Sequence, residues 1–240
     1  MKNLFFAFAI MLTAVTAQAK TLIVYYSYTN NVERIVTELS NQIEADVIEV
    51  EPAEKGLDYA ANNYAIGSAQ IAAIRENPDD AASYPAIDPV NVNMSQYSTI
   101  IIGAPLWWSS MAAPLQTFLF QYGKEMSGKN IGLIVSSASS GISGVESDAK
   151  RLIPDGNFLS PSLWIRSSRT SDANSLLSNW LQTIDYYGLT TGIKNLTREN
   201  DGQFTAYSLS GIRILTNADS TSYLSNGIYI INGKKILISR

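Results

Sequence analysis

Three short stretches of the chain concentrate side chains and backbone groups that could hold a ligand. The first stretch consists of Ser27, Tyr28, Thr29, Asn30, Asn31 and Val32. It follows an apolar run and opens a helical pattern, so its hydroxyls, amides and backbone N–H groups would stand at a helix N-terminus, where an anion is stabilised. It suits a phosphate, although it contains no Lys or Arg. Capping of the helix by Asn30 or Thr29 alone is an open alternative.

The second stretch places two adjacent tryptophans in the turn after another apolar run. It consists of Pro105, Leu106, Trp107 and Trp108. Large apolar rings in a turn need something to cover them, and a flat ligand or the preceding residues 52–96 could do so. Because successive side chains point in different directions, we expect at least one ring to face a ligand. Core packing of both rings is the alternative.

The third stretch is small and polar, and it also follows an apolar run. It consists of Ser137, Ala138, Ser139, Ser140 and Gly141. Small residues allow backbone amides to approach the edge of a heterocycle. Many loops are rich in Ser and Gly, so this stretch gains meaning only from its place beside the other two.

Alternating strand and helix patterns position these stretches. The apolar runs predict strands at residues 21–26, 46–51, 98–103, 130–136 and 162–166. Helical spacing predicts helices at 30–44, 112–122, 145–153 and 173–187, with a further helical piece at 59–75 inside a less regular crossover, 52–96. This α/β alternation is typical of a parallel sheet covered on both faces. Ligands bind beyond the carboxyl ends of such strands, which is where the three stretches fall.

The two ends of the chain differ from this domain, which spans residues 20–187. Residues 1–19 have a charged start, an apolar stretch and an Ala17-Gln18-Ala19 cleavage pattern, which predict a secretory signal peptide and a periplasmic or secreted protein. A buried N-terminal helix is the alternative. Residues 188–240 predict a β-rich extension with strands at 204–209, 212–217, 223–224, 227–231 and 235–238, and with Asn-Gly hairpin signals at 226–227 and 232–233.

Composition excludes several kinds of chemistry. The chain has no His and no Cys, so Ser-His-Asp and Cys-His catalysis are impossible and zinc sites are disfavoured. We expect no catalytic side chain and no metal, and therefore that any redox chemistry comes from a cofactor. The net charge of −4 and the lack of a Lys/Arg run give no reason to expect nucleic acid as a partner. No segment after the signal is long and apolar enough for a membrane span.

The sequences YYSYTNN and GAPLWW and the Ser/Gly-rich third stretch resemble the flavodoxin family, specifically its short-chain group. The resemblance extends over residues 20–187 and includes ESDAKRLIPDGNFLSPSLWI at 146–165. It implies a doubly wound sheet of order 2-1-3-4-5 and flavin mononucleotide (FMN) as the cofactor. Within it, Ser27 to Val32 would hold the phosphate, Pro105 to Trp108 the isoalloxazine ring, and Ser137 to Gly141 the polar edge of the flavin.

The chain departs from the family pattern at four positions. Asn30 replaces a usual Gly, and Val32 replaces a usual Thr or Ser, which removes one hydroxyl from the phosphate. Ala138 and Ser139 replace glycines in the third stretch. Asn tolerates a left-handed backbone, so the change at Asn30 is mild. We expect the other changes to weaken FMN binding without abolishing it.

The resemblance implies electron transfer by FMN outside the cytoplasm, either as a carrier or as an oxidoreductase, with an unidentified redox partner or small-molecule acceptor. The alternative is an exported binding module that has kept the fold, lost flavin, and binds another small anionic or aromatic ligand. The end of the chain also resembles the C-terminal sorting segments of type IX secreted proteins. An ordinary β extension that packs on the main domain is the alternative there.

Overall fold

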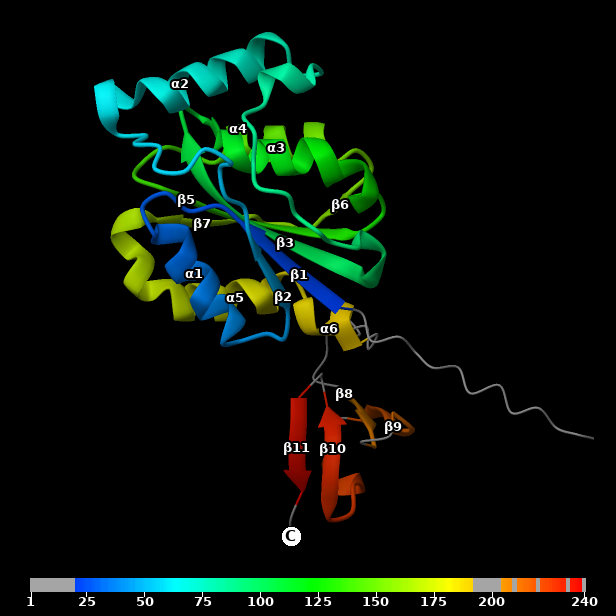
Figure 1. The fold of residues 1–240 in the computed structure, drawn as a ribbon. Coiled ribbons are helices and arrows are strands. Elements are labelled where there is room, and N and C mark those ends of the chain that lie inside the picture. Colours follow the sequence, from blue (N-terminus) through cyan, green and yellow to red (C-terminus); the bar gives the residue numbers. More distant parts are fainter. Residues whose placement is uncertain (1–19, 192–203, 209–210, 219–220, 232–233, 239–240) are drawn as a thin grey trace, which may run out of the picture.

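The structure, a computed structural model, describes residues 20–191, 204–208, 211–218, 221–231 and 234–238. The predicted signal peptide lies outside these residues. A parallel sheet and its covering helices occupy the chain up to residue 191, and an antiparallel sheet occupies the C-terminal part (Figure 1).

The central sheet has the order β2-β1-β3-β5, followed by a fifth position that two short strands share. Its strands are β1 (Lys20–Tyr25), β2 (Asp46–Glu49), β3 (Tyr97–Trp107), β5 (Asn130–Ser137), β6 (Asn157–Phe158) and β7 (Leu163–Arg166). Both β6 and β7 pair with β5 in parallel, and β4 (Ser110–Met111) folds back antiparallel onto β3. The order 2-1-3-4-5 implied by the resemblance is confirmed. Sequence patterns missed β4 and β6 because each has only two residues.

Helices cover both faces of this sheet. One face carries α1 (Asn31–Ser40) and α5 (Ala173–Thr183), and α6 (Tyr186–Thr191) follows α5. The other carries α2 (Ala61–Glu76), α3 (Ala113–Tyr122) and α4 (Ser143–Leu152) (Figure 1). Alternate residues of β1 supply the two cores: Ile23 packs with α1 and α5, whereas Leu22 and Val24 pack toward the opposite face. The strand is buried on both faces, as its continuous apolar sequence predicted.

Helix α1 packs closely on the centre of the sheet because Gly103 of β3 has no side chain. A Cβ atom at Gly103 would lie 3.0 Å from Val32 Cγ1 and 2.9 Å from Tyr25 Cβ. Val32, with Ile35 at helical spacing, lies on the buried face of α1. This packing fixes the N-terminus of α1 over the carboxyl ends of β1 and β3.

The C-terminal sheet has the order β11-β10-β8-β9 and its own small core. Its strands are β8 (Phe204–Tyr207), β9 (Arg213–Ala218), β10 (Gly227–Ile231) and β11 (Lys234–Ile238). The strand predicted at 223–224 is wrong, since Thr221–Tyr223 forms a 3-10 turn in which Tyr223 is exposed. The Asn-Gly pair at 226–227 therefore lies between this turn and β10, and the hairpin expected there does not form. Ile231 pairs with Lys234, which matches the hairpin expected at 232–233.

Candidate functional site

The carboxyl ends of β1, β3 and β5 bring the three predicted stretches to one edge of the sheet. Tyr25 pairs with Gly103, and Pro105 pairs with Ser136. The segments that follow these residues are the three loops singled out in the sequence. They are called below the first loop (residues 26–32), the second loop (105–109) and the third loop (137–142).

The first loop reaches α1 through a left-handed residue, Asn30, with φ 58°. Its side-chain bonds are local: Ser27 Oγ accepts a hydrogen bond from Glu33 N at 3.3 Å, and Asn31 Nδ2 donates to Thr29 Oγ1 at 3.0 Å. Asn30 stands at the cap position but makes no side-chain capping bond. The alternative that Asn30 or Thr29 serves only to cap the helix is therefore wrong, because Ser27 takes that role.

Five consecutive backbone N–H groups in this loop point to an anion site. The groups belong to Tyr28, Thr29, Asn30, Asn31 and Val32. Within the described part of the chain, no atom accepts a hydrogen bond from any of them. The next two N–H groups of the helix are already used, because Glu33 N donates to Ser27 Oγ and Arg34 N donates to Asn30 O at 3.1 Å. A run of N–H groups leading into a helix N-terminus suits a phosphate. The Val32 side chain is buried, so this residue contributes only its amide.

The Tyr28 side chain contacts the segment that precedes α2. Its hydroxyl donates to Asp58 Oδ1 at 3.0 Å and accepts from Ala60 N at 3.1 Å. Its ring lies edge-on to Tyr59, with ring centroids 5.4 Å apart. These contacts tie the first loop to the segment before α2.

The second loop is a tight turn between β3 and β4. Trp108 and Ser109 occupy its two central positions with φ values of 45° and 61°. Such turns favour Asn-Gly, because both central residues need a positive φ. The Arg75 guanidinium of α2 donates to Trp108 O and, at 2.9 Å, to Ser110 Oγ, which holds the turn. Unfavourable backbone geometry held in place by its surroundings is a feature of functional sites.

The two tryptophans have different environments, as the sequence suggested. Trp107 is half-buried, with its ring centroid 4.8 Å from that of Tyr59 and 5.6 Å from that of Tyr26. Trp108 is 42% exposed. The ring available to a ligand is therefore Trp108. Pro105 and Leu106 are half-buried, and Leu106 packs against the core.

Helix α2 packs behind these rings, in agreement with the expectation that residues 52–96 could cover them. A Cβ atom at Gly67 would lie 3.0 Å from Trp108 Cζ3 and 3.3 Å from Trp107 Cε3. Gly67 therefore lets α2 approach the rings, and Arg75, two turns later, reaches the backbone of the same turn. A lone Gly inside a helical pattern was the one signal in the sequence that could have indicated this close approach.

The third loop combines one structural serine with an exposed backbone. Ser137 is buried, and its hydroxyl accepts from Trp164 Nε1 at 2.8 Å and donates to Ser140 O at 2.9 Å. The residues from Ala138 to Gly141 are exposed. None of their backbone N–H groups has an acceptor among the described residues. The loop thus offers amides to a ligand, while the Ser137 side chain fixes its shape.

Comparison with known proteins places the chain in a family. Residues 20–184 match the model of a family described as flavodoxin. The chain belongs to the flavodoxin family. No curated protein matches it in sequence.

Solved flavodoxin-like structures agree with this membership. A putative flavoprotein from Bacteroides eggerthii is 25% identical, with 70% of this chain and 98% of that chain covered and a TM-score of 0.55. A flavoprotein from Lactobacillus acidophilus, solved in complex with FMN, is 25% identical over 65% of this chain and 99% of that chain, with a TM-score of 0.51. A putative flavoprotein from Bacteroides uniformis, 23% identical over 67% of this chain and 98% of that chain, shares the fold with a TM-score of 0.53.

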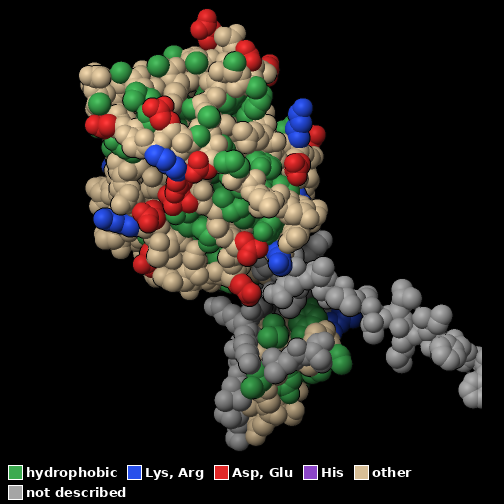
Figure 2. All heavy atoms as spheres, in the orientation of Figure 1, with side chains coloured by type: hydrophobic (Ala, Val, Ile, Leu, Met, Phe, Trp, Pro, Cys, Tyr) green, Lys and Arg blue, Asp and Glu red, His purple; other side chains and the backbone are tan. Residues whose placement is uncertain are grey.

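A hollow of about 230 Å³ lies beside the first loop of this flavodoxin-family domain, toward the end of β2. Three tyrosines and two glutamates are among the residues that line it: Tyr26, Tyr28, Tyr59, Glu49 and Glu51. On the face shown in Figure 2, acidic side chains are scattered with a few Lys and Arg among them. Burial raises the pKa of the Glu49 carboxyl, which accepts a 3.0 Å hydrogen bond from the Tyr25 hydroxyl.

No group of three or more His, Cys, Asp or Glu side chains in the described residues is placed to hold a metal ion. No helix in the same residues has the length and apolar character that crossing a membrane requires.

Proposed function

We propose that this domain holds FMN non-covalently and uses it for electron transfer outside the cytoplasm. The observation that supports FMN most strongly is the row of free N–H groups from Tyr28 to Val32 at the carboxyl end of β1. Charge-assisted hydrogen bonds from such groups are among the strongest that a protein makes, which compensates for the lack of Lys or Arg in the loop. The related Lactobacillus flavoprotein binds FMN.

The other two loops supply a place for the flavin ring. Trp108, half-exposed beyond β3, provides a surface for stacking. The exposed amides from Ala138 to Gly141 provide donors for the polar edge of a heterocycle. The three loops thus offer groups for the phosphate of FMN, for the face of its isoalloxazine ring and for the polar edge of that ring.

The bound flavin would supply the redox chemistry, and the protein would set its potential. Glu49, Glu51 and Glu54 lie around the hollow beside the first loop, with Lys55 as the cation among them. Lys55 donates to Asp88 at 2.7 Å and to Glu51, so its charge is already balanced. A negative local field disfavours additional negative charge on the ring, which lowers the reduction potential.

A spectroscopic experiment tests the proposal. The mature chain, residues 20–240, is incubated with FMN, desalted, and examined by visible absorption and flavin fluorescence. We expect co-eluting flavin with quenched fluorescence, because an aromatic ring in contact with the flavin quenches it. Trp108→Ala should retain less flavin, whereas Tyr223→Phe, a change on the exposed C-terminal turn, should retain as much as the wild type. Failure of the wild type to retain any flavin would favour the alternative of a binding module without flavin.

The export part of the proposal rests on residues 1–19 and has a separate test. Expression of the full chain in a Gram-negative bacterium, followed by N-terminal sequencing of the exported protein, should give Lys20 as the first residue. An intact N-terminus on a protein that stays in the cytoplasm would contradict export. The compartment found would limit the candidates for the redox partner, whether a protein or a small-molecule acceptor.

A further inference from the structure

A positive charge stands beside the third loop at Arg166, the last residue of β7. The backbone of Arg166 pairs with that of Ser137, where the third loop begins. Side chains alternate between the two faces of a strand. Ile165 packs in the core under α1 and α5, so its neighbours Trp164 and Arg166 lie on the opposite face, which α4 covers (Figure 1).

The indole ring of Trp164 positions the Arg166 guanidinium at this end of the sheet. Trp164 pairs with Val135, yet its Nε1 donates a 2.8 Å hydrogen bond to Ser137, two residues further along β5. The ring therefore leans toward the carboxyl ends of the strands. The guanidinium carbon of Arg166 lies 5.0 Å from the ring centroid, which is within the range of a cation–π contact. Because Ser137 also donates to Ser140 O, the ring that carries Arg166 is bonded to the residue that shapes the third loop.

Arg166 is exposed, and within the described residues it forms no ion pair. The two carboxylates in the first half of α4 are engaged elsewhere. Glu146 accepts a 2.7 Å hydrogen bond from Ser162, which precedes β7 at its amino end. Asp148 accepts from Met111 N at 2.9 Å. Arg166 consequently retains its positive charge for a ligand at the third loop.

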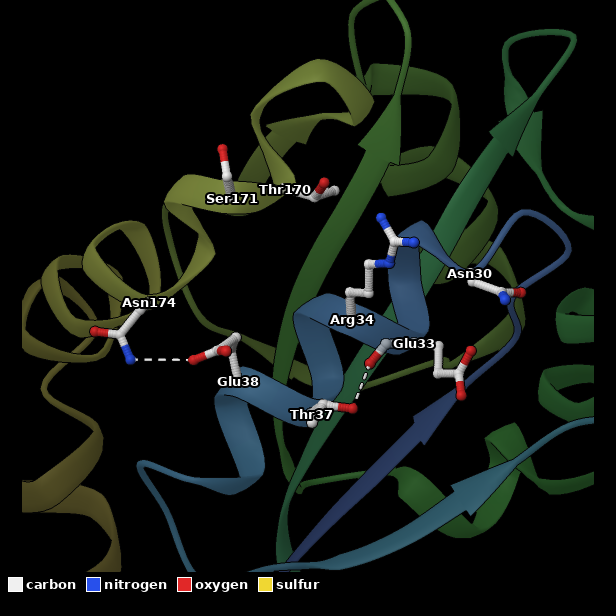
Figure 3. A pocket seen from close by; sticks show the side chains of 8 residues that line it. All are labelled: Asn30, Glu33, Arg34, Thr37, Glu38, Thr170, Ser171 and Asn174. Atoms are coloured by element: carbon white, nitrogen blue, oxygen red, sulfur yellow. Dashed lines mark hydrogen bonds between the residues drawn. The ribbon is translucent and has the colours of Figure 1, made fainter.

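Two other arginines near the loops are placed differently. Arg75 donates to the backbone of the second loop. Arg34 lies in a polar pocket of about 520 Å³ between α1 and α5 (Figure 3). Glu33 and Glu38 line the same pocket, so two negative charges offset that of Arg34. Of these three arginines, Arg166 is the one beside the third loop.

A cation at this place acts on the charge that a flavin gains on reduction. The oxidised isoalloxazine ring is neutral. Full reduction adds two electrons from the redox partner and one proton at N5, and it leaves one negative charge that N1 and the C2 carbonyl oxygen share. These two atoms belong to the polar edge of the ring, which faces the third loop in the proposed function. An opposite charge within about 4–6 Å favours the charged form of a group.

The glutamates around the hollow lie on the far side of the sheet from Arg166. Glu49 ends β2, and the sheet order places β1, β3 and β5 between β2 and β7. At about 4.8 Å for each step between strands, the two sites are about 19 Å apart. This separation exceeds the Debye length of about 8 Å at physiological ionic strength. The polar edge of a flavin in the third loop is therefore influenced more by Arg166 than by these glutamates.

We propose that Arg166, positioned by Trp164, stabilises the negative charge of fully reduced FMN and thereby raises the potential of its two-electron reduction. The inference rests on the proposed function, since it requires FMN with its polar edge at the third loop. Arg166 thus opposes the effect of the glutamates, which act from the side of the first loop.

Sulfite titration of the FMN-loaded mature chain tests the inference without catalytic turnover. Sulfite adds to N5 of oxidised flavin: its electron pair forms the N–S bond, a negative charge moves to N1 and the C2 carbonyl oxygen, and the visible absorbance is lost. The wild type should form this adduct. Arg166→Gln should bind sulfite at least about tenfold more weakly. Its affinity for oxidised FMN should change by less than about twofold, because the oxidised ring is neutral.

Three variants separate the local charge from other effects. Arg166→Lys keeps the charge and should retain most of the sulfite affinity. Trp164→Phe keeps a ring but loses the bond to Ser137, so its sulfite affinity should lie between those of the wild type and Arg166→Gln. Arg169→Gln is the matched control, since it removes the same charge from a residue that is paired with Asp172, and it should behave as the wild type.

Potentiometry of the same proteins provides a second measurement. Arg166→Gln should lower the two-electron potential of the bound flavin by about 30 mV, which corresponds to a tenfold change in the equilibrium. Arg166→Lys and Arg169→Gln should leave it close to the wild-type value.

Equal sulfite affinity and equal potential in the wild type and Arg166→Gln would overturn the inference. Equal changes in Arg166→Gln and Arg169→Gln would also overturn it, because net charge would then explain the effect. In both cases FMN still binds, so the proposed function stands. Failure of the wild type to retain FMN would remove the proposed function together with the inference.

Discussion

A Cβ atom at Gly144 would lie 1.7 Å from the backbone carbonyl oxygen of Ser109, so the first turn of α4 touches the turn between β3 and β4. This approach joins the second loop to the third. Met111 N adds a 2.9 Å hydrogen bond to Asp148 Oδ2 of α4. The two loops proposed to enclose the flavin ring are thus held together by backbone contacts that leave no room for a side chain.

Gly144→Ala should destabilise the protein and weaken flavin binding. The added methyl group must displace backbone, for which overpacking costs of about 1–3 kcal/mol are typical. Thermal denaturation without flavin measures the first effect and titration with FMN the second. Gly141→Ala is the control for stability, since a Cβ atom there would have no neighbour within 4 Å. Equal melting temperatures for the two variants would mean that the contact is not fixed in the folded protein.

Trp107 and Trp108 should respond differently to replacement by Ala. Trp108→Ala should weaken FMN binding by about 0.5–1.5 kcal/mol beyond the loss of buried area, and raise the reduction potential of the bound flavin. Trp107→Ala should mainly lower stability, because it removes ring contacts with Tyr26 and Tyr59. Fluorescence titration and potentiometry on the first variant, with melting curves on both, separate the two effects. Unchanged FMN affinity in both variants would exclude the second loop from the site.

Alkaline pH should destabilise the fold through Tyr26. Burial raises the pKa of the Tyr26 hydroxyl in the folded state above its ordinary value of 10, which applies to the unfolded state. At a pH between the unfolded-state pKa and the folded-state pKa, the folded protein therefore keeps a proton that the unfolded chain releases. The full free energy of unfolding is present below pH 10, and it decreases as the pH rises from 10 through the folded-state pKa of Tyr26. Tyr26→Phe should therefore lose less stability than the wild type between about pH 8 and about pH 11 in denaturant titrations. The exposed Tyr64→Phe should follow the wild type, and identical curves for all three proteins would refute the role of Tyr26.

Removal of residues 201–240 should leave the flavin domain folded. The C-terminal sheet has a separate core of Ala206, Leu224 and Ile231, and the family match ends at residue 184. Circular dichroism and a melting curve of the truncated chain should retain one cooperative transition. Loss of that transition would show that the C-terminal sheet stabilises the main domain.

The sheet was predictable from the sequence because its central strands, β1, β3 and β5, are largely buried on both faces. Continuous apolar runs such as residues 21–26 and 130–136 are typical of parallel strands, and the helices between them fixed the layers. The position of the three loops followed from the same pattern, since the carboxyl ends of parallel strands share an edge. The C-terminal part was harder to predict: Tyr223 was expected in a strand, but it lies in a 3-10 turn next to the buried Leu224.

Contacts between distant segments were not predictable. The close approach of α2 to the tryptophans depends on Gly67. The hydrogen bond from the Arg75 guanidinium to the Trp108 carbonyl oxygen joins residues that are more than thirty positions apart in the sequence. The roles of similar side chains also depend on geometry: Ser137 looked like its exposed neighbours, yet its hydroxyl is used inside the fold. Sequence identified the loops, whereas the structure distinguishes groups that shape them from groups free to bind.

The phosphate site has a direct test in paired titrations of FMN and riboflavin, which differ only in the phosphate. Each hydrogen bond to a charged group contributes about 1.5–3 kcal/mol, so a few of the five free N–H groups would give FMN at least a tenfold advantage. Thr29→Ala and Asn31→Ala should each reduce this advantage while riboflavin affinity stays nearly constant. Because these two side chains are hydrogen-bonded to each other, the double variant should lose less than the sum of the single losses.

Comparison of FMN and riboflavin affinities in the wild type is the measurement that bears most directly on the account. The account predicts that FMN binds at least about tenfold more tightly, and that the Thr29 and Asn31 variants narrow this difference. Equal affinity for the two flavins would contradict it, because the first loop would then hold no phosphate.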